Sequence, residues 1–324
     1  MAMDGRKSPQ KEANRLSMML RMALGEDRFP IDIQQLALEV SKNNEDPIEK
    51  VVGGDLPGFE GMLRAHRKRP AWHIVYNEEP RYRGRERFTV AHELGHYLLH
   101  RPKLGQADYP DGQLSRSCDF QCLPLQSNAW KAAEKQREEE ADTFASYLLM
   151  PLDDYRRQVD GLEMTRSLLG HITDRYGVSL LAAVRKWIEF TDRRAVMVVA
   201  TDGFALWGRA SRAAFQSGVF IRSGMEIPDG SVAALGPTAL QPEVDHAVAL
   251  PSGVWTFSRG SEPARELSFF SERLRMSVSL LHFDDDDRGA EINEEEPWDV
   301  YDQFTANGQF PTSFFPRYEY QPVT

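Results

Sequence analysis

Residues 88–100 read Phe-Thr-Val-Ala-His-Glu-Leu-Gly-His-Tyr-Leu-Leu-His, and the rest of the chain can be interpreted outward from them. The apolar residues of this stretch recur at helical spacing, which predicts a helix from Arg87 to about His100. Residues four apart lie about 6 Å from each other on one face of a helix. His92 and His96 are therefore expected to point the same way.

The His-Glu-x-x-His pattern within this helix predicts a metal site. Two imidazoles at this spacing converge on one Zn²⁺, and the intervening Glu93 reaches the water that the metal activates. Without a metal, two histidines beside an apolar face would be buried without obvious partners. We therefore expect one zinc ion per chain, held by His92 and His96, with Glu93 as the catalytic general base.

A zinc site of this kind needs a third protein ligand. His100 lies about 12 Å from His92 along the helix axis, too far for both to bind one ion, so we expect it to support the site or lie at the surface. The group that stabilises the oxyanion besides zinc is not identified by the pattern. Tyr97, His100 and His171 are unranked candidates for that role.

The next predicted helix, from about Ala129 to Met150, carries three consecutive glutamates that can supply the third ligand. At 100° per residue, Glu139 points away from the apolar stripe of this helix, whereas Glu138 and Glu140 flank the stripe on either side. Helix geometry alone therefore leaves both Glu138 and Glu140 as candidates.

These stretches, with others in the same order along the chain, resemble the ImmA/IrrE family of metallopeptidases. The resemblance covers about residues 10–190. The stretches that carry it are Pro30-Ile31-Asp32, Val75-Tyr76-Asn77, Phe88 to His96, Glu140-Ala141-Asp142 and Leu148-Leu149-Met150-Pro151.

The resemblance implies a fold, a ligand and an activity. It implies an α+β fold with a zincin-like core, in which a small sheet accompanies the His-Glu-x-x-His helix and a glutamate-bearing helix. It also implies that Glu140 is the third ligand. Members of the family are bacterial and phage zinc endopeptidases that cleave a helix-turn-helix transcriptional repressor, which releases stress-response or mobile-element genes.

Residues 165–190 have the pattern of a helix-turn-helix, with Gly177 at the turn and Ser179 as the N-cap of the second helix. The exposed basic residues expected there, Arg185 and Lys186, come late in that helix, whereas residues that read bases usually lie near its start. Packing or repressor docking is therefore favoured over direct DNA binding. The alternative function is a non-catalytic, zinc-containing regulator that binds a repressor or DNA.

Short β-rich runs follow Thr191, which places a domain boundary there. We expect a metallopeptidase domain at residues 1–190 and a β-rich domain with a mixed or antiparallel sheet at 191–283, which regulates or recognises. An acidic, aromatic tail is expected at 284–324. The β-rich runs are at 195–200, 204–207, 254–257, 266–270 and 276–283.

The composition excludes a disordered, a collagenous and a membrane protein. With 324 residues, 41% of them hydrophobic, the chain can bury one or two ordinary cores. Residues 284–302 contribute −9 to the net charge of −10, so the remainder is nearly neutral and offers no global basic surface for nucleic acid. The two cysteines, Cys118 and Cys122, are expected to be reduced thiols. The apolar run from Ala195 to Ala200 is too short to span a bilayer. We therefore expect a cytoplasmic protein without membrane contact.

Overall fold

A computed structural model describes residues 8–56, 58–78, 85–103, 120–122, 132–236, 244–257, 260, 262–271 and 275–284. The chain divides into two compact units, Met1–Trp187 and Ile188–Thr324, and each is described by itself. The predicted tail lies outside the described residues except for Asp284, and so does Cys118.

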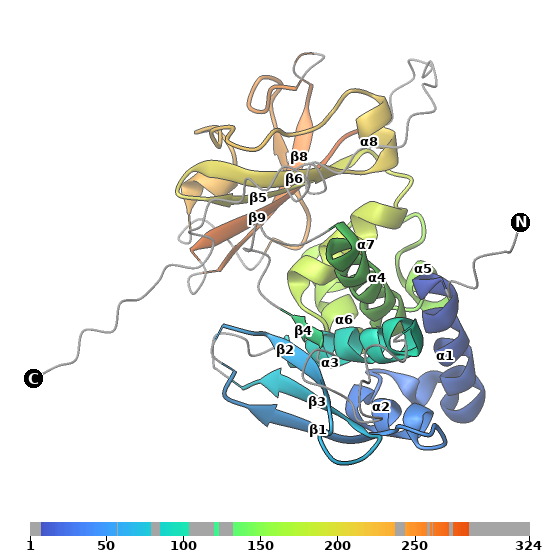
Figure 1. The fold of residues 1–324 in the computed structure, drawn as a ribbon. Coiled ribbons are helices and arrows are strands. Elements are labelled where there is room, and N and C mark those ends of the chain that lie inside the picture. The colour runs from blue at the N-terminus through green and yellow to red at the C-terminus, as the bar shows by residue number, and fades with distance from the viewer. Residues whose placement is uncertain are drawn as a thin grey trace, which may run out of the picture. The chain divides into compact units, whose positions relative to one another are not determined.

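The first unit contains a four-stranded mixed sheet in the order β1-β3-β2-β4 (Figure 1). β1 runs parallel to β3, and β2 runs antiparallel to both β3 and β4. The strands are β1 Ile48–Gly54, β2 Gly61–Ala65, β3 Trp72–Asn77 and β4 Phe120–Cys122.

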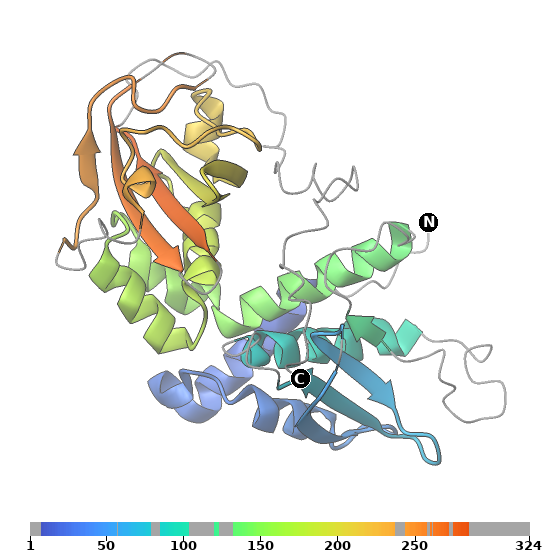
Figure 2. The same ribbon diagram turned by 90° about the vertical axis from the view of Figure 1, so that its left-hand side faces the viewer.

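Helices cover this sheet and complete the first unit (Figures 1 and 2). α3 lies against β2 and β3, and α4 packs across α3. A π-turn, His96–His100, continues α3 directly. The α-helices are α1 Pro9–Leu24, α2 Ile33–Ser41, α3 Glu86–Gly95, α4 Ala132–Leu149, α5 Leu152–Val159, α6 Arg166–Tyr176 and α7 Leu180–Phe190, and the short 3₁₀ turns are Gly25–Arg28 and Arg101–Lys103.

α3 and α4 approach each other closely at Gly95. A Cβ added to Gly95 would lie 3.1 Å from Phe144 Cδ1 and 3.2 Å from the Cα of Ala141. A larger residue at position 95 would therefore push the helices apart. The contact continues into a core to which Leu94, Phe144 and Leu148 contribute fully buried side chains.

The helix-turn-helix pattern has the predicted turn. Gly177 ends α6 with φ +61°, a left-handed conformation that favours glycine. Ser179 Oγ accepts a hydrogen bond from Ala182 N at 3.2 Å, as expected of an N-cap residue. A Cβ on Gly177 would meet Arg87 Nε at 2.9 Å, so this turn packs closely on the chain segment that begins α3.

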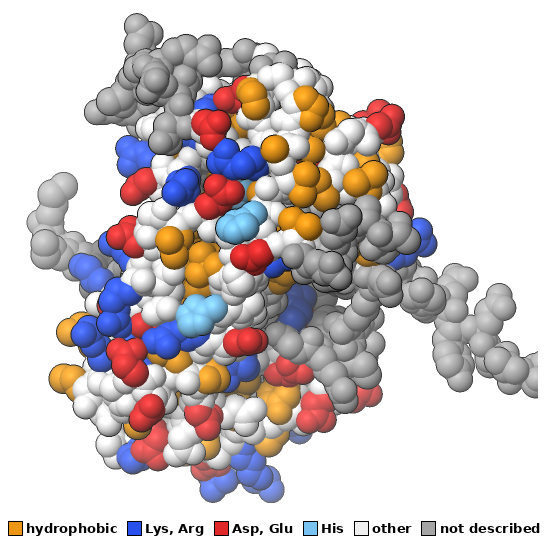
Figure 3. Space-filling model, turned by 180° about the vertical axis from the view of Figure 1, so that it is seen from behind, with side chains coloured by type: hydrophobic (Ala, Val, Ile, Leu, Met, Phe, Trp, Pro, Cys, Tyr) orange, Lys and Arg blue, Asp and Glu red, His pale blue; other side chains and the backbone are white. Residues whose placement is uncertain are grey.

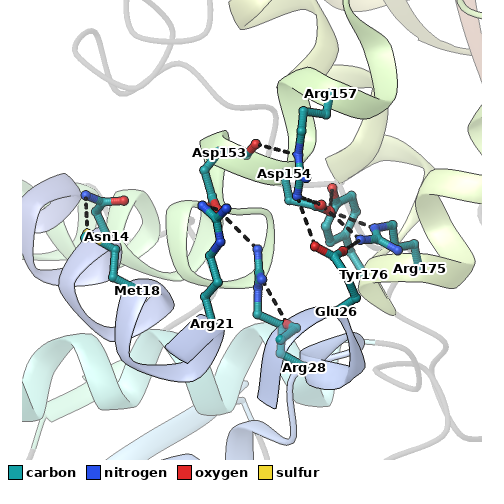
Figure 4. A network of polar contacts seen from close by, with 11 residues as sticks. Asn14, Met18, Arg21, Glu26, Arg28, Asp153, Asp154, Arg157, Arg175 and Tyr176 are labelled. Atoms are coloured by element: carbon teal, nitrogen blue, oxygen red, sulfur yellow. Dashed lines mark hydrogen bonds and ion pairs between the residues drawn. The ribbon is translucent and has the colours of Figure 1, made fainter. Parts of the chain in front are cut away.

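A buried polar network ties α5 to α6 (Figure 4). Asp154 is fully buried, and its carboxylate accepts hydrogen bonds from Arg175 Nε and Tyr176 OH, both at 2.7 Å, and from Arg157 Nη2 at 2.8 Å. Burial alone would raise the pKa of Asp154, but the hydrogen bonds from Arg175 and Tyr176 outweigh it and lower the pKa. The ionised carboxylate therefore stabilises the folded unit.

We predict that Asp154→Ala destabilises this unit by about 3 kcal/mol, because it leaves the buried Tyr176 hydroxyl and the largely buried Arg175 without their anion. The melting temperature should fall by about 6–12 °C for a unit of this size. Asp160→Ala, at the exposed end of α5, is the matched control and should melt like wild type. The pKa of Asp154 is lower in the folded than in the unfolded chain, so its contribution is present above about pH 4 and is lost as the pH falls further. The role of Asp154 would be contradicted if wild type and Asp154→Ala melted at the same temperature at pH 7. It would also be contradicted if the difference between their melting temperatures grew on acidification.

The second unit is built on a five-stranded antiparallel sheet in the order β6-β5-β9-β8-β7. Val196, Val198 and Leu281 of the sheet form a core with Trp255 and Phe257 from a connection. The elements are β5 Ala195–Thr201, β6 Phe204–Ala210, α8 Arg212–Gln216, a 3₁₀ turn at Ala233–Leu235, β7 Val248–Leu250, β8 Ala264–Ser271 and β9 Met276–His282.

A buried carboxylate organises the interior of the second unit. Glu266 on β8 is fully buried and accepts hydrogen bonds from the backbone N–H groups of Val232 and Ala233 at 2.9 and 3.1 Å. The hydroxyls of Ser268 and Ser279 also donate to it, each at 2.8 Å. Multiple donors offset the cost of burying a charge, so Glu266 fixes the 3₁₀ turn against the sheet.

The α+β fold class is confirmed, with one small mixed sheet and one antiparallel sheet. The strand predicted at 254–257 is wrong, because these residues bury aromatic side chains in a connection, with a single bridge between Phe257 and Gly260. β7 was not predicted. In the part of the chain that the structure describes, no helix has both the length and the apolarity required to cross a membrane.

Candidate metal centre

The two histidines of the His-Glu-x-x-His pattern meet on one face of the α3 segment. His92 Nε2 lies 3.0 Å from His96 Nε2, and the ring centroids are 4.8 Å apart. His92 is 7% exposed and His96 is fully buried. Helical spacing therefore brings the two imidazoles together, as the sequence predicts.

Glu138 from α4 completes a group of three. Its carboxylate oxygens lie 3.1 Å from His92 Nε2 and 3.2 Å from His96 Nε2. Around a tetrahedral zinc ion with bonds of about 2.0–2.1 Å, ligand atoms lie about 3.3 Å apart. The three donor atoms are already near that spacing, so the residues fit a zinc ion, and two histidines with one glutamate are a set that catalytic zinc sites use.

The charge states of these side chains also suit a cation. Burial lowers the pKa of His96, which keeps its imidazole neutral near pH 7. Burial alone would raise the pKa of Glu138, but its contacts with His92 and His96 outweigh burial and hold the pKa below its usual value. Neutral imidazole and ionised carboxylate are the forms that bind metal.

The structure does not bring Glu140, the third ligand implied by the family resemblance, to this pair of histidines. Glu140 Oε2 instead lies 3.1 Å from His100 Nε2. Two residues along a helix differ in direction by about 200°, so Glu138 and Glu140 cannot both face the same pair. The packing of α4 on α3 selects Glu138, the alternative left open by helix geometry.

Asp142, one turn after Glu138, supports the first histidine. Its Oδ1 lies 2.7 Å from His92 Nδ1. A carboxylate at this nitrogen fixes the tautomer that leaves Nε2 available for a metal and makes the imidazole a stronger ligand. This role of Asp142 was not predicted from the sequence, although the Glu-Ala-Asp triplet and the four-residue spacing from Glu138 are visible signals.

Glu93 lies on α3 between the two histidines and is fully buried. Its carboxylate is next to the start of β2, since a Cβ added to Gly61 would lie 3.0 Å from Glu93 Oε1. The same Cβ would lie only 2.3 Å from Thr89 Cγ2, so glycine at position 61 leaves room for Thr89 and for the Glu93 carboxylate beside it. A buried, ionisable group in this place can take or give a proton once water and substrate are present.

Two of the three candidates for the oxyanion role lie elsewhere. Tyr97 OH donates to the carbonyl of Asp46 at 3.0 Å and accepts from Asn44 Nδ2 at 2.9 Å. His171, on α6, bonds Gln158 Oε1 at 2.8 Å. His100 alone of the three joins the site, because its Nδ1 lies 2.8 Å from His96 Nδ1.

Of the two basic residues expected late in the helix-turn-helix segment, Lys186 does not project outward. Lys186 is 1% exposed, with Nζ 3.3 Å from Ser146 Oγ and 3.5 Å from the centre of the Tyr147 ring. It therefore binds α4 rather than projecting outward. On the face shown in Figure 3, the visible Lys and Arg side chains are interspersed with Asp and Glu.

Comparison with known proteins gives one family. Residues 56–187 match the peptidase family described as the IrrE N-terminal-like domain, a range that contains both histidines, Glu93 and Glu138. Among solved structures, a Mycobacterium tuberculosis transcriptional regulator is similar, with 14% identity and a TM-score of 0.48 over 85% of this chain and 75% of that one. No curated protein matches the chain.

Proposed function

We propose that this chain, whose residues 56–187 form an IrrE N-terminal-like peptidase domain, is a zinc-dependent endopeptidase. The observation that carries the proposal is the convergence of His92 Nε2, His96 Nε2 and the Glu138 carboxylate within 3.0–3.2 Å of one another. Glu93 lies on the same helix segment as the two histidines. Three protein ligands leave a fourth position open, which distinguishes a catalytic from a structural zinc site.

The residues have separable roles in peptide hydrolysis. His92, His96 and Glu138 would hold a zinc ion, which would supply the Lewis acid that polarises a scissile carbonyl and lowers the pKa of water towards neutrality. Glu93 accepts the proton of the attacking water and returns it to the departing amine nitrogen. Asp142 keeps the His92 ring in its binding orientation.

We further propose that the substrate is a helix-turn-helix transcriptional repressor, cleaved in the cytoplasm to release stress-response or mobile-element genes. The resemblance to the ImmA/IrrE family supports this substrate class. The antiparallel second unit would then recognise a signal or the repressor. The burial of Lys186 favours protein docking over direct DNA contact at α7.

Comparison of protein N-termini tests this function. Cells expressing wild type and cells expressing Glu93→Gln are compared both with and without DNA damage. A new N-terminus inside a helix-turn-helix repressor should appear only in the cells that express wild type. The same cut should appear when purified wild type and repressor are mixed with zinc, and chelation should abolish it. Zinc-loaded protein that binds a repressor without cutting it would contradict the proposal and favour a non-catalytic regulator.

A further inference from the structure

A second line of polar side chains runs from the buried candidate ligand His96 through His100 to Glu140 and the exposed Gln136. His96 Nδ1 lies 2.8 Å from His100 Nδ1, and His100 Nε2 lies 3.1 Å from Glu140 Oε2. The other oxygen of Glu140 accepts from Gln136 Nε2 at 3.1 Å. His100 is only 2% exposed, so its bonds to His96 and Glu140 form in a largely dry environment.

The backbone at this point is specialised. The Arg101 N–H donates to the carbonyl of His96, five residues back, and thus closes the π-turn. Such turns are rare and occur frequently at functional sites. The two imidazoles within the turn have centroids 4.8 Å apart, which places His100 directly behind His96.

The bonds dictate where each proton lies. If His96 binds a metal through Nε2, its Nδ1 carries the hydrogen and donates it. The Nδ1 of His100 must then accept, so the hydrogen of neutral His100 is on Nε2 and is donated to the Glu140 carboxylate. The carboxylate at the end of the line thereby selects the tautomers of both rings.

We propose that His100 and Glu140 are positioning residues that hold His96 in the tautomer and orientation required for zinc binding. The inference rests on the proposed metal centre and assigns Glu140 a role distinct from that of a ligand. The two candidate ligand histidines have different partners. His92 contacts a carboxylate directly, that of Asp142, whose side chain is 51% exposed. His96 is connected to the Glu140 carboxylate through the buried His100. Outer partners of this kind raise ligand basicity and fix the ring.

Zinc affinity of the purified full chain, measured by competition with a chromogenic chelator, tests the role of His100. We expect His100→Leu to bind zinc about 10–100-fold more weakly, the usual loss for such a partner. His100→Asn retains an acceptor near the position of Nδ1 and should recover part of the affinity. Tyr97→Phe, a buried neighbour in the same turn, should bind as wild type. If His100→Leu and His100→Asn lost zinc affinity equally, the effect would come from packing alone, and the proposal would be overturned.

The role of Glu140 has its own matched control on α4. Glu140→Ala should weaken zinc binding, whereas Glu139→Ala, which removes the same charge from a 58% exposed side chain, should not. Equal affinities of these two variants would overturn the assignment of Glu140.

Ring ¹⁵N spectra of zinc-loaded, histidine-labelled protein give a readout that a merely structural role would not produce. We expect His96 as the Nδ1–H tautomer and His100 as the Nε2–H tautomer, with the His100 population becoming mixed in Glu140→Ala. His100 as the Nδ1–H tautomer in wild type would refute the proposal. These readouts do not depend on cleavage, so a protein that binds zinc without cutting refutes the proposed function and leaves this inference standing.

Discussion

Glu138→Ala is expected to leave the chain without stoichiometric zinc, because it removes one of three protein ligands. The affinity should fall by more than the roughly 10–100-fold that loss of an outer hydrogen-bond partner costs. His92→Ala should behave in the same way. Metal analysis after gel filtration against limiting chelator measures this directly, and wild type should retain one zinc per chain.

The neighbouring glutamates provide the controls for this result. Glu139→Ala should retain one zinc, and Glu140→Ala should fill at saturating zinc despite a weaker site. If Glu140→Ala could not be loaded with zinc and Glu138→Ala could, Glu140 would be the third ligand. That result would contradict the packing of α4 described above.

Glu93→Gln is expected to retain zinc but to cut substrate about 10²–10⁴-fold more slowly, the usual contribution of a general base. The amide nearly matches the carboxylate in size, so the space beside Gly61 remains filled and the fold is preserved. The rate of repressor cleavage at equal zinc content is the measurement.

The matched control for Glu93 lies in the first turn of α3. Glu86→Gln removes the same charge from the same helix and should cut at the wild-type rate. Cleavage by Glu93→Gln at the rate of this control would remove Glu93 from the mechanism.

The sequence predicts the part of the site that depends on one helix. His92, His96 and Glu93 need only the helical repeat to take their places, and the structure brings the two histidines together. The third carboxylate depends on how α4 is rotated against α3, and the two helices approach closely where Gly95 faces Ala141. A single sequence contains no measure of that rotation, which explains why Glu138 and Glu140 stayed unresolved by helix geometry.

The second unit shows the same limit for strands. The β-rich runs at 195–200 and 266–270 form the central β5 and β8, because their apolar residues have both backbone and side-chain partners. The run at 254–257 is also mostly apolar, but Trp255 buries its ring from a connection and gives its indole N–H to Glu266 at 3.3 Å. Burial without ladder pairing cannot be distinguished from a strand by composition.

Anomalous diffraction at the zinc edge, from crystals of the full chain grown with zinc, tests the metal centre most directly. We expect one peak about 2.0–2.2 Å from His92 Nε2, His96 Nε2 and a Glu138 oxygen, with a fourth position not filled by protein. A peak bound by Glu140 in place of Glu138, a fourth protein ligand closing the site, or no peak near these histidines would contradict it.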